Sequence, residues 1–396
     1  MTPTRFRERQ ERGERLGRPL KYLGRVAEVD EELLDRLGRG MSERDEPGAA
    51  LAEAIGSQRV SMQQVRTALE SGVGAVADAP EPLRAFFAEV TTVPEWVDWE
   101  LVNEGGRVMN RLGQNAADVL MQLSLIGGYR FGGPTDLLVA TGGLSGEGTL
   151  RRLAETQKWT ISLSTPDALR PSGEAWRLTV HVRAMHALVN ASFESRWDNE
   201  RWGLPINQTD QAGTLGLFDG ALIIGCRALG VRIDQDDARA LMHLWRWVGQ
   251  LMGVPADLLT DDEWERHRIN YHVLLSQAGI SEAGPKLAQA IVAAQDDRGY
   301  PGWPRSLKPV RARYERERLL SMLTTFLGVG SMHELGLPVR PPWAFGYLIP
   351  LNTLRYRVLG RTRLGARMLG AWGDWTSRRI LDAYFGGDVE ALAELR

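Results

Sequence analysis

The chain has 396 residues, of which 43% are hydrophobic and 25% charged, and such values are typical of globular proteins that bury a sizeable core. The formal net charge is −2, and no basic stripe interleaved with aromatic residues occurs, which argues against a nucleic-acid partner. The single cysteine, Cys226, excludes an intramolecular disulfide and a cysteine-rich metal site.

The N-terminal segment is charged throughout and reads MTPTRFRERQERGERLGRPLKYLGRV. It lacks the apolar region of a signal peptide, and no later stretch approaches the roughly 20 apolar residues that span a bilayer. We therefore expect a cytoplasmic protein. Residues 1–50 are also rich in glycine and weakly periodic, which predicts a partly ordered arm that wraps the body of the protein.

Helical periodicity begins near residue 49 and continues through most of the chain. Apolar residues at spacings of three and four predict helices at 82–90, 101–112, 114–126, 150–163, 174–193, 210–229, 235–252, 260–277, 282–295 and 310–326, with more helix in the Arg-rich segment 348–396. Pro134 suits the first position of a helix, and Gly253 suits a C-cap. Because convincing alternating strands are absent, we predict an all-α fold.

The segment TGGLSGEG at 141–148 looks like a fragment of a phosphate-binding loop. It has no predicted strand before it and no GK[ST] signature, both of which such a loop requires. We therefore expect residues 141–148 to be a linker between two helices.

One of the six histidines stands out by its position. His186 lies in the apolar stripe of the predicted helix at 174–193, whose members are Leu178, Val182, Met185, Val189 and Phe193. An imidazole buried there must be hydrogen-bonded or coordinated, since burying it without a partner is costly. A satisfied core histidine and a metal ligand both fit, and haem requires only one protein ligand in an apolar helical pocket.

The preceding predicted helix carries Arg152, Glu155 and Thr156 at steps of three and four, which places all three on one face. One interpretation is a solvated face with an Arg–Glu pair. The other is a polar cluster over a cofactor, in which Arg152 and Thr156 donate hydrogen bonds to oxygen and Glu155 acts as a base.

Several separated segments, in the same order, resemble the latex-clearing proteins, the b-type haem rubber oxygenases, and the wider oxygenase domain shared with a fungal enzyme of mycophenolic acid biosynthesis. The segments are VPEWVDWELVNEGGRVMNRLG at 93–113, RRLAETQKW at 151–159, RLTVHVRAMHALVN at 177–190, PINQTDQAGTLGLFD at 205–219 and ALGVRIDQDDARALMHLWRWVGQLMGVPADLL at 228–259. The resemblance covers roughly residues 80–295.

The resemblance implies a globin-like helical core around haem b, with additional helices at both ends. It implies an N-terminal arm with helices at 1–80, a haem-binding core at 81–295 and a C-terminal helical extension at 296–396. His186 matches the family's proximal iron ligand, and Arg152 and Thr156 match its distal arginine and threonine.

Two departures from the family pattern matter. Rubber oxygenases typically carry a lysine that can ligate the iron where this chain has Glu155, so we expect a five-coordinate or water-bound iron, or a different distal partner. The family also uses a glutamate as a candidate base, which Asp136 matches best by spacing and Glu147 second best. The second departure is the missing export signal, which favours a soluble or membrane-dissolved isoprenoid, or another unsaturated lipid, over rubber.

The resemblance therefore predicts a haem-dependent oxygenase that uses dioxygen to cleave a C=C bond in a hydrophobic substrate. His186 would anchor the iron, Arg152 and Thr156 would steady oxygen, and Glu155 or Asp136 would remove an allylic proton. The alternatives are a haem hydroxylase, peroxygenase or dehydratase acting on a smaller metabolite, a non-catalytic haem-binding protein, and a helical scaffold without a cofactor.

The expected partners are thus dioxygen and a hydrophobic small molecule or polyisoprenoid, with no nucleic acid. We expect a monomer or a small homo-oligomer. The Arg-rich helices at 354–372 leave two readings open, namely a solvated basic face and a peripheral contact with an anionic membrane.

Overall fold

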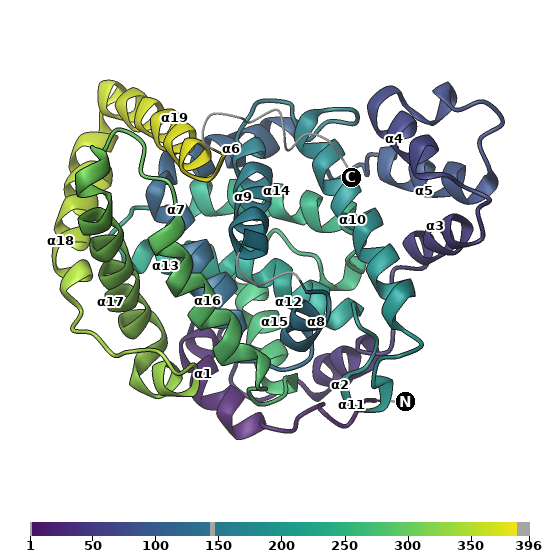
Figure 1. The fold of residues 1–396 in the computed structure, drawn as a ribbon, viewed down its shortest axis with the longest axis horizontal. Coiled ribbons are helices and arrows are strands. Elements are labelled where there is room, and N and C mark those ends of the chain that lie inside the picture. Colours follow the sequence, from purple (N-terminus) through teal and green to yellow (C-terminus); the bar gives the residue numbers. More distant parts are fainter. Residues whose placement is uncertain (1, 143–146, 386–396) are drawn as a thin grey trace. The chain divides into compact units, whose positions relative to one another are not determined.

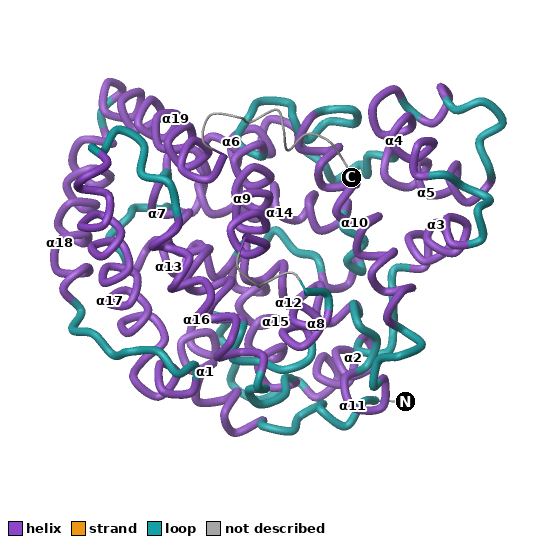
Figure 2. The backbone as a smooth tube through the Cα atoms, viewed as in Figure 1, coloured by secondary structure: helices purple, strands orange, loops and turns teal. Residues whose placement is uncertain are grey.

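This computed structural model describes residues 2–142 and 147–385, and that part of the chain is helical with no strand, as the sequence predicts (Figure 2). Backbone contacts divide the chain into two units. Unit 1 consists of residues 1–106, 162–216 and 239–278, and unit 2 consists of residues 107–161, 217–238 and 279–396. The division into an arm, a core and an extension remains a prediction.

Unit 1 is built from helices that lie far apart in the sequence. It contains α1 (Gln10–Leu23), α2 (Glu31–Gly40), α3 (Glu46–Gly56), α4 (Met62–Ser71), α5 (Glu81–Thr91), α10 (Glu174–Phe193), α11 (Asn199–Trp202) and α15 (Glu263–Ser276). Helices α6 (Trp99–Leu112), α12 (Gln208–Phe218) and α14 (Gln235–Leu251) are each divided between the two units.

Packing in unit 1 follows two groups of helices. Helices α1 and α2 pack on α15, and α3 packs on both α5 and α10 (Figure 1). Glycines bring α1 close to α15, since a Cβ atom added at Gly13 would lie 2.3 Å from the Leu274 carbonyl oxygen. The residues up to 50 are therefore more helical than their weak periodicity predicts.

Unit 2 contains α7 (Gln114–Val119), α8 (Pro134–Ala140), α9 (Glu147–Ser162, of which only the last residue belongs to unit 1), α13 (Gly220–Ala228), α16 (Ala283–Asp297), α17 (Lys308–Glu334), α18 (Trp343–Asn352) and α19 (Arg363–Phe385). A π-helical stretch, η2 (Leu120–Ile126), extends α7. A second π-helical stretch and a short 3-10 turn, η5 (Thr353–Val358) and η6 (Leu359–Arg361), connect α18 to α19.

The packing of unit 2 centres on α17, which lies alongside α16 and α18 (Figure 1). Pro134 begins α8, as predicted, and in unit 1 Gly253 adopts a φ of +79° after α14. The predicted helix at 210–229 is instead two helices, because the backbone leaves the helical region at Asp219, whose carboxylate accepts a hydrogen bond from the Gly220 amide. Of the predicted linker at 141–148, residues 143–146 lie outside the described residues, and α9 begins at Glu147.

Candidate functional site

Helix α10 presents two different faces. Its buried face contains Trp176, whose indole N–H donates to the Val90 carbonyl at 3.0 Å, and Arg183. The apolar stripe predicted from the sequence lies on another face, where Leu178, Val182, Met185, Val189 and Phe193 are only half-buried. The protein therefore covers one face of α10 closely and leaves an apolar face partly open.

His186 is half-buried and lies at the border between these two faces of α10, one turn beyond Arg183. On the side of the buried face it lines a pocket of about 10 Å³ together with Arg183 and Met252. That pocket has room for about one water molecule. This pocket is therefore too small to hold a haem.

An ion-pair cluster fixes α10 in unit 1. The fully buried guanidinium of Arg183 donates two hydrogen bonds to the Asp45 carboxylate, both of 2.7 Å, and one of 2.7 Å to Glu89. Burial alone would lower the pKa of Arg183, but the two carboxylates raise it above its ordinary value. Because Asp45 precedes α3 and Glu89 lies on α5, the cluster ties α10 to both helices.

These features of α10 fit a haem. A b-type haem requires one axial protein ligand and an apolar surface for its ring, and His186 with its half-buried apolar neighbours supplies both. Within residues 2–142 and 147–385, no group of three or more His, Cys, Asp or Glu side chains is placed to hold a metal ion. The fit rests on one imidazole and the apolar side chains beside it.

The predicted distal residues belong to unit 2, on α9. Arg152 is half-buried, whereas Glu155 and Thr156 are exposed on the same face of the helix. Glu155 accepts a hydrogen bond of 3.0 Å from Arg151. Burial raises the pKa of Tyr129, and the positive charge of Arg152 opposes that shift, so this guanidinium acts on a buried group of unit 2.

The two candidate bases are placed differently. Asp136 is half-buried in the first turn of α8, where its carboxylate accepts a hydrogen bond of 2.9 Å from the Gly133 amide. This contact caps the helix N-terminus. Glu147 begins α9, but its side chain lies outside the described part of the structure. The structure thus gives Asp136 a structural contact, and its catalytic role stays a prediction.

Three other histidines have partners within unit 1. The ring nitrogens of His243 and His272 accept hydrogen bonds from backbone amides, and His267 contacts a carboxylate one turn away. Burial lowers the pKa of both His243 and His272, which favours their neutral forms. The partners are Asp98 N for His243 (3.0 Å), Asp30 N for His272 (2.8 Å) and Glu263 for His267 (3.2 Å).

Sequence reasoning missed the cluster around Arg183. Arg183 is separated from Asp45 by 138 residues and from Glu89 by 94, so no local spacing connects them. The only signal in the sequence is that Arg183 is the one Arg, Lys, Asp or Glu within residues 178–193, three positions before His186. That signal does not identify the partners.

Comparison with known proteins identifies the class to which this fold and these residues belong. The model of the family described as "ER-bound oxygenase mpaB/B'/Rubber oxygenase, catalytic domain" matches residues 104–362. The match covers more than half of the chain, and the chain belongs to this family of oxygenases, which are oxidoreductases.

Two individual proteins are similar to this chain. A rubber oxygenase of Streptomyces sp. (strain K30) is 23% identical over 185 residues, which span 44% of either chain. The solved structure titled "Structure of Latex Clearing Protein LCP in the closed state" matches with a TM-score of 0.65 and 18% identity, over 86% of this chain and 91% of that one. This likeness shows a shared all-helical fold, and a globin-like core remains a prediction.

Proposed function

We propose that the chain is a haem b-dependent oxygenase that uses dioxygen to cleave a C=C bond of an isoprenoid or another unsaturated hydrophobic substrate. Membership of the oxygenase family supports the reaction class. The observation that supports haem is the position of His186 beside a half-open apolar face of α10. Spectroscopy of the purified protein, with the variants described below, tests the proposal.

The proposal gives each candidate residue a role. His186 would hold the haem iron, and the haem would supply the chemistry that activates dioxygen. Arg152 and Thr156 donate hydrogen bonds that hold and orient the oxygen co-substrate. Glu155 or Asp136 would take an allylic proton and return it to the substrate as the C=C bond is cleaved, and each must first give up its present partner, Arg151 or the Gly133 amide.

The proposed reaction adds both oxygen atoms of O₂ to the substrate. The alkene bond breaks, and each of its two carbons becomes a carbonyl carbon, so no external reductant is consumed. Half-buried apolar side chains such as Leu178, Met185 and Val189 provide the kind of surface that an unsaturated hydrocarbon chain requires. A polyisoprenoid and a smaller isoprenoid both meet this chemical requirement.

A second candidate is a haem hydroxylase or peroxygenase that acts on a smaller metabolite. The exposed carboxylate of Glu155 favours it, because a carboxylate near the iron suits acid–base chemistry with peroxide. Comparing substrate turnover with hydrogen peroxide against turnover with dioxygen separates the two. A non-catalytic haem-binding protein would convert no olefin faster than free haemin does.

Substitution of Glu155 by lysine is expected to shift the ferric absorbance spectrum toward a low-spin form. A lysine amine placed on this face of α9 can serve as a second strong axial ligand, which a carboxylate does not. The isosteric variant Glu155→Gln is the matched control and should keep the spectrum of the unmodified protein. A spectrum that is the same in all three proteins would show that residue 155 does not face the iron.

No helix in the described part of the chain is long and apolar enough to cross a bilayer. A cytoplasmic location and a monomeric or small homo-oligomeric state remain predictions from the sequence. The structure does, however, bear on the proposed peripheral contact with a membrane, because an apolar surface of unit 2 is exposed.

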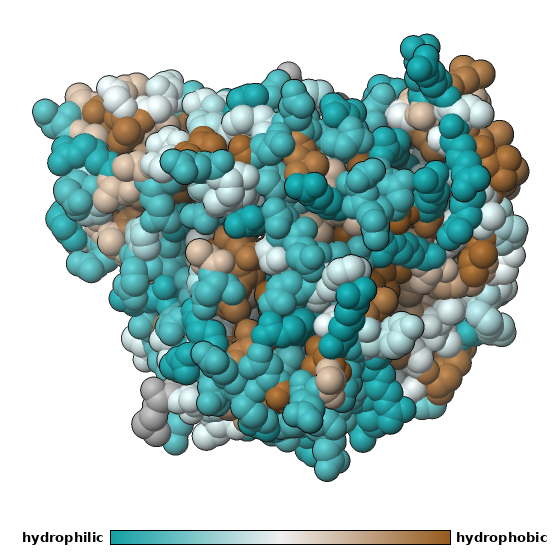
Figure 3. All heavy atoms as spheres, turned by 180° about the vertical axis from the view of Figure 1, so that it is seen from behind, coloured by the Kyte–Doolittle hydropathy of each residue, from teal (hydrophilic) through white to brown (hydrophobic). Residues whose placement is uncertain are grey.

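Helix α19 carries a second apolar stripe besides its buried one. Leu364, Met368 and Trp375 are 70%, 61% and 48% exposed, and with Ala371 they follow steps of four, three and four along one line. Figure 3 shows apolar side chains, in brown, among hydrophilic ones near the C-terminal helices at its right-hand edge. Exposed apolar side chains in a line on one helix are typical of an interaction surface.

The charges around this stripe favour an anionic lipid surface. Residues 341–373 contain five arginines and no lysine or acidic residue. Four of these arginines, Arg357, Arg361, Arg363 and Arg367, are exposed and form no ion pair with a described residue. A second copy of the chain would bring like charges together, whereas anionic headgroups would neutralise them.

The protein is therefore expected to float with vesicles that contain phosphatidylglycerol and not with pure phosphatidylcholine, and high salt should weaken the binding. Met368→Glu should abolish flotation, because it places a charge in the apolar stripe. Val329→Glu, at a 50% exposed position of α17, is the matched control and should bind normally. Equal flotation of the two variants would contradict the proposal.

A further inference from the structure

Unit 2 contains a cavity of about 220 Å³ that none of the proposed catalytic residues lines. Its wall is formed by residues of α7, η2, α9, α16, α17 and α19 and of the loop at 298–301, and all of these lining residues belong to unit 2. The volume is far more than one water molecule requires. The lining combines aromatic rings, such as Trp372 and Tyr300, with many polar side chains.

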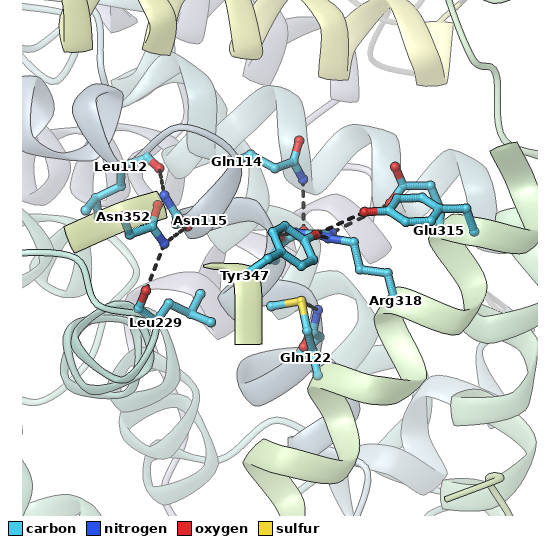
Figure 4. Close-up of polar contacts among 12 residues, drawn as sticks. Leu112, Gln114, Asn115, Gln122, Leu229, Glu315, Arg318, Tyr347 and Asn352 are labelled. Atoms are coloured by element: carbon cyan, nitrogen blue, oxygen red, sulfur yellow. Dashed lines mark hydrogen bonds and ion pairs between the residues drawn. The ribbon is translucent and has the colours of Figure 1, made fainter. Parts of the chain in front are cut away.

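A buried ion pair forms one wall of the cavity. Arg318 on α17 donates two hydrogen bonds to the Asp118 carboxylate on α7, one of them 3.1 Å long, and Gln114 donates to the same carboxylate at 2.9 Å. Figure 4 shows the side chains of Arg318 and Gln114 reaching toward the same point. Asp118 and Glu315 raise the pKa of Arg318 against the opposing effect of burial. The charged groups on this wall of the cavity are therefore already paired with one another.

Other polar groups of the cavity have no partner among residues 2–142 and 147–385. Four buried atoms in its lining form no hydrogen bond with this part of the chain: the side-chain oxygen of Gln122, Nε of Arg298, the Thr376 hydroxyl and the Tyr384 hydroxyl. The side chains of Gln122 and Thr376 are almost fully buried, at 1% and 3% exposure. Buried polar groups in proteins nearly always have a partner, so four unpaired ones around a single space indicate a polar occupant.

The charge of the lining identifies the class of occupant. Four arginines and two carboxylates line the cavity, and the carboxylates of Asp118 and Glu315 already bond to Arg318 and Arg311. Arg298 and Arg379 instead stack on Tyr384 and Trp375, and neither forms an ion pair with a described carboxylate. Two guanidinium groups without a carboxylate partner among the described residues, next to hydroxyl donors, are complementary to an anion.

We propose that this cavity binds a small organic carboxylate, held by Arg298 and Arg379 and by the hydroxyls of Thr376 and Tyr384. The planar guanidinium group matches a carboxylate through paired hydrogen bonds, and the hydroxyls supply further donors. The rings of Trp372 and Tyr300 flank the space and accommodate the apolar part of such a molecule. The site does not depend on haem, so it stands whether or not the proposed function holds.

Calorimetric titration of the full-length protein tests this site. Benzoate and succinate are the probes, and benzamide and succinamide are their neutral counterparts. We expect saturable binding of at least one carboxylate with one molecule per chain, at least about tenfold tighter than its amide. Absence of saturable carboxylate binding, or equal affinity for the amide, would overturn the proposal. Binding of inorganic phosphate alone would also overturn it, in favour of a phosphate site.

Variants then locate the binding. Thr376→Val and Arg379→Gln should each weaken benzoate or succinate binding by about tenfold. Arg378→Gln is the matched control, because Arg378 is the exposed neighbour of Arg379 on α19 and does not line the cavity. Thr376→Val keeps the shape of the side chain, so the test does not depend on an unfolded variant. Carboxylate affinity that is equal in all three variants would refute this assignment.

Removal of an unpaired hydroxyl gives an independent readout. Tyr384→Phe should leave the melting temperature of the ligand-free protein unchanged or raised, because it removes a buried group that has no partner. The same variant should gain less thermal stability than the unmodified protein when the bound carboxylate is added. An equal gain in both proteins would show that Tyr384 does not contact the ligand.

Discussion

Replacement of His186 by alanine is expected to yield folded protein that lacks the Soret absorbance of bound haem. The proposed iron has a single protein ligand, so removing its imidazole removes the bond that retains the cofactor. The absorbance spectrum of the ferric and the dithionite-reduced protein, with and without carbon monoxide, provides the measurement. Circular dichroism of the same samples shows whether the helices remain intact.

His181→Ala is the matched control for this experiment. His181 is a half-buried histidine on the same helix, outside the predicted apolar stripe, and its removal should leave the spectrum unchanged. Added imidazole should restore part of the Soret band in the His186→Ala protein, because it can occupy the vacated ligand position. A colourless unmodified protein, or a pigment that survives the loss of His186, would refute the haem assignment.

Replacement of Arg183 by methionine is expected to destabilise the protein by about 3–5 kcal/mol. The substitution leaves the carboxylates of Asp45 and Glu89 without their shared counter-charge, in a position where Arg183 is almost fully buried. Chemical denaturation measures the loss in the free energy of unfolding. Because Arg183 lies one turn before His186 on α10, haem retention should fall as well.

The control for this prediction is Arg196→Met. Arg196 is exposed just beyond the end of α10, where its guanidinium stacks on Phe193 at 4.1 Å from the ring centre. Loss of such an exposed contact should change the free energy of unfolding by about 1 kcal/mol or less. If the two variants unfold alike, the Arg183 cluster is not what fixes α10.

Much of the helical fold could be predicted from periodicity alone. Helix α10 has the predicted bounds, and α9 and α14 differ from prediction by a few residues, because a long apolar stripe with clear end signals is a local property. The single helix expected over 210–229 is interrupted at Asp219, where a side-chain contact to Gly220 competes with the helical hydrogen bonds.

The N-terminal helices show a different limit. Glycine lowers intrinsic helix propensity, so Gly13 and Gly17 obscured the helical signal of α1. The structure explains their use, because a Cβ atom at either position would overlap α15, at the Leu274 carbonyl and at the Tyr271 ring. The close packing that these glycines allow involves a helix more than 200 residues away in the sequence, so no local sequence pattern indicates it.

For the candidate site, the sequence could select only groups of residues that lie on one helix. His186 in its apolar stripe and the shared face of Arg152, Glu155 and Thr156 are such groups, and their roles remain predictions. The Arg183 cluster and the cavity in unit 2 were not identifiable, since each joins residues from helices distant in the sequence. Charged residues that come together only in the folded protein produce no periodic pattern in the sequence.

In unit 1, helices from the start of the chain pack against helices much later in the sequence. This packing limits where the protein can be truncated. The oxygenase domain model begins at residue 104, yet Asp45 and Glu89, which neutralise Arg183, precede that point. The same holds for Val26 and Leu34, which complete a small hydrophobic core with Tyr271 and Leu275. A fragment restricted to the matched domain would expose this core to water and leave the buried guanidinium of Arg183 without its carboxylates. The matched domain is therefore shorter than the part of the chain that must be present for folding.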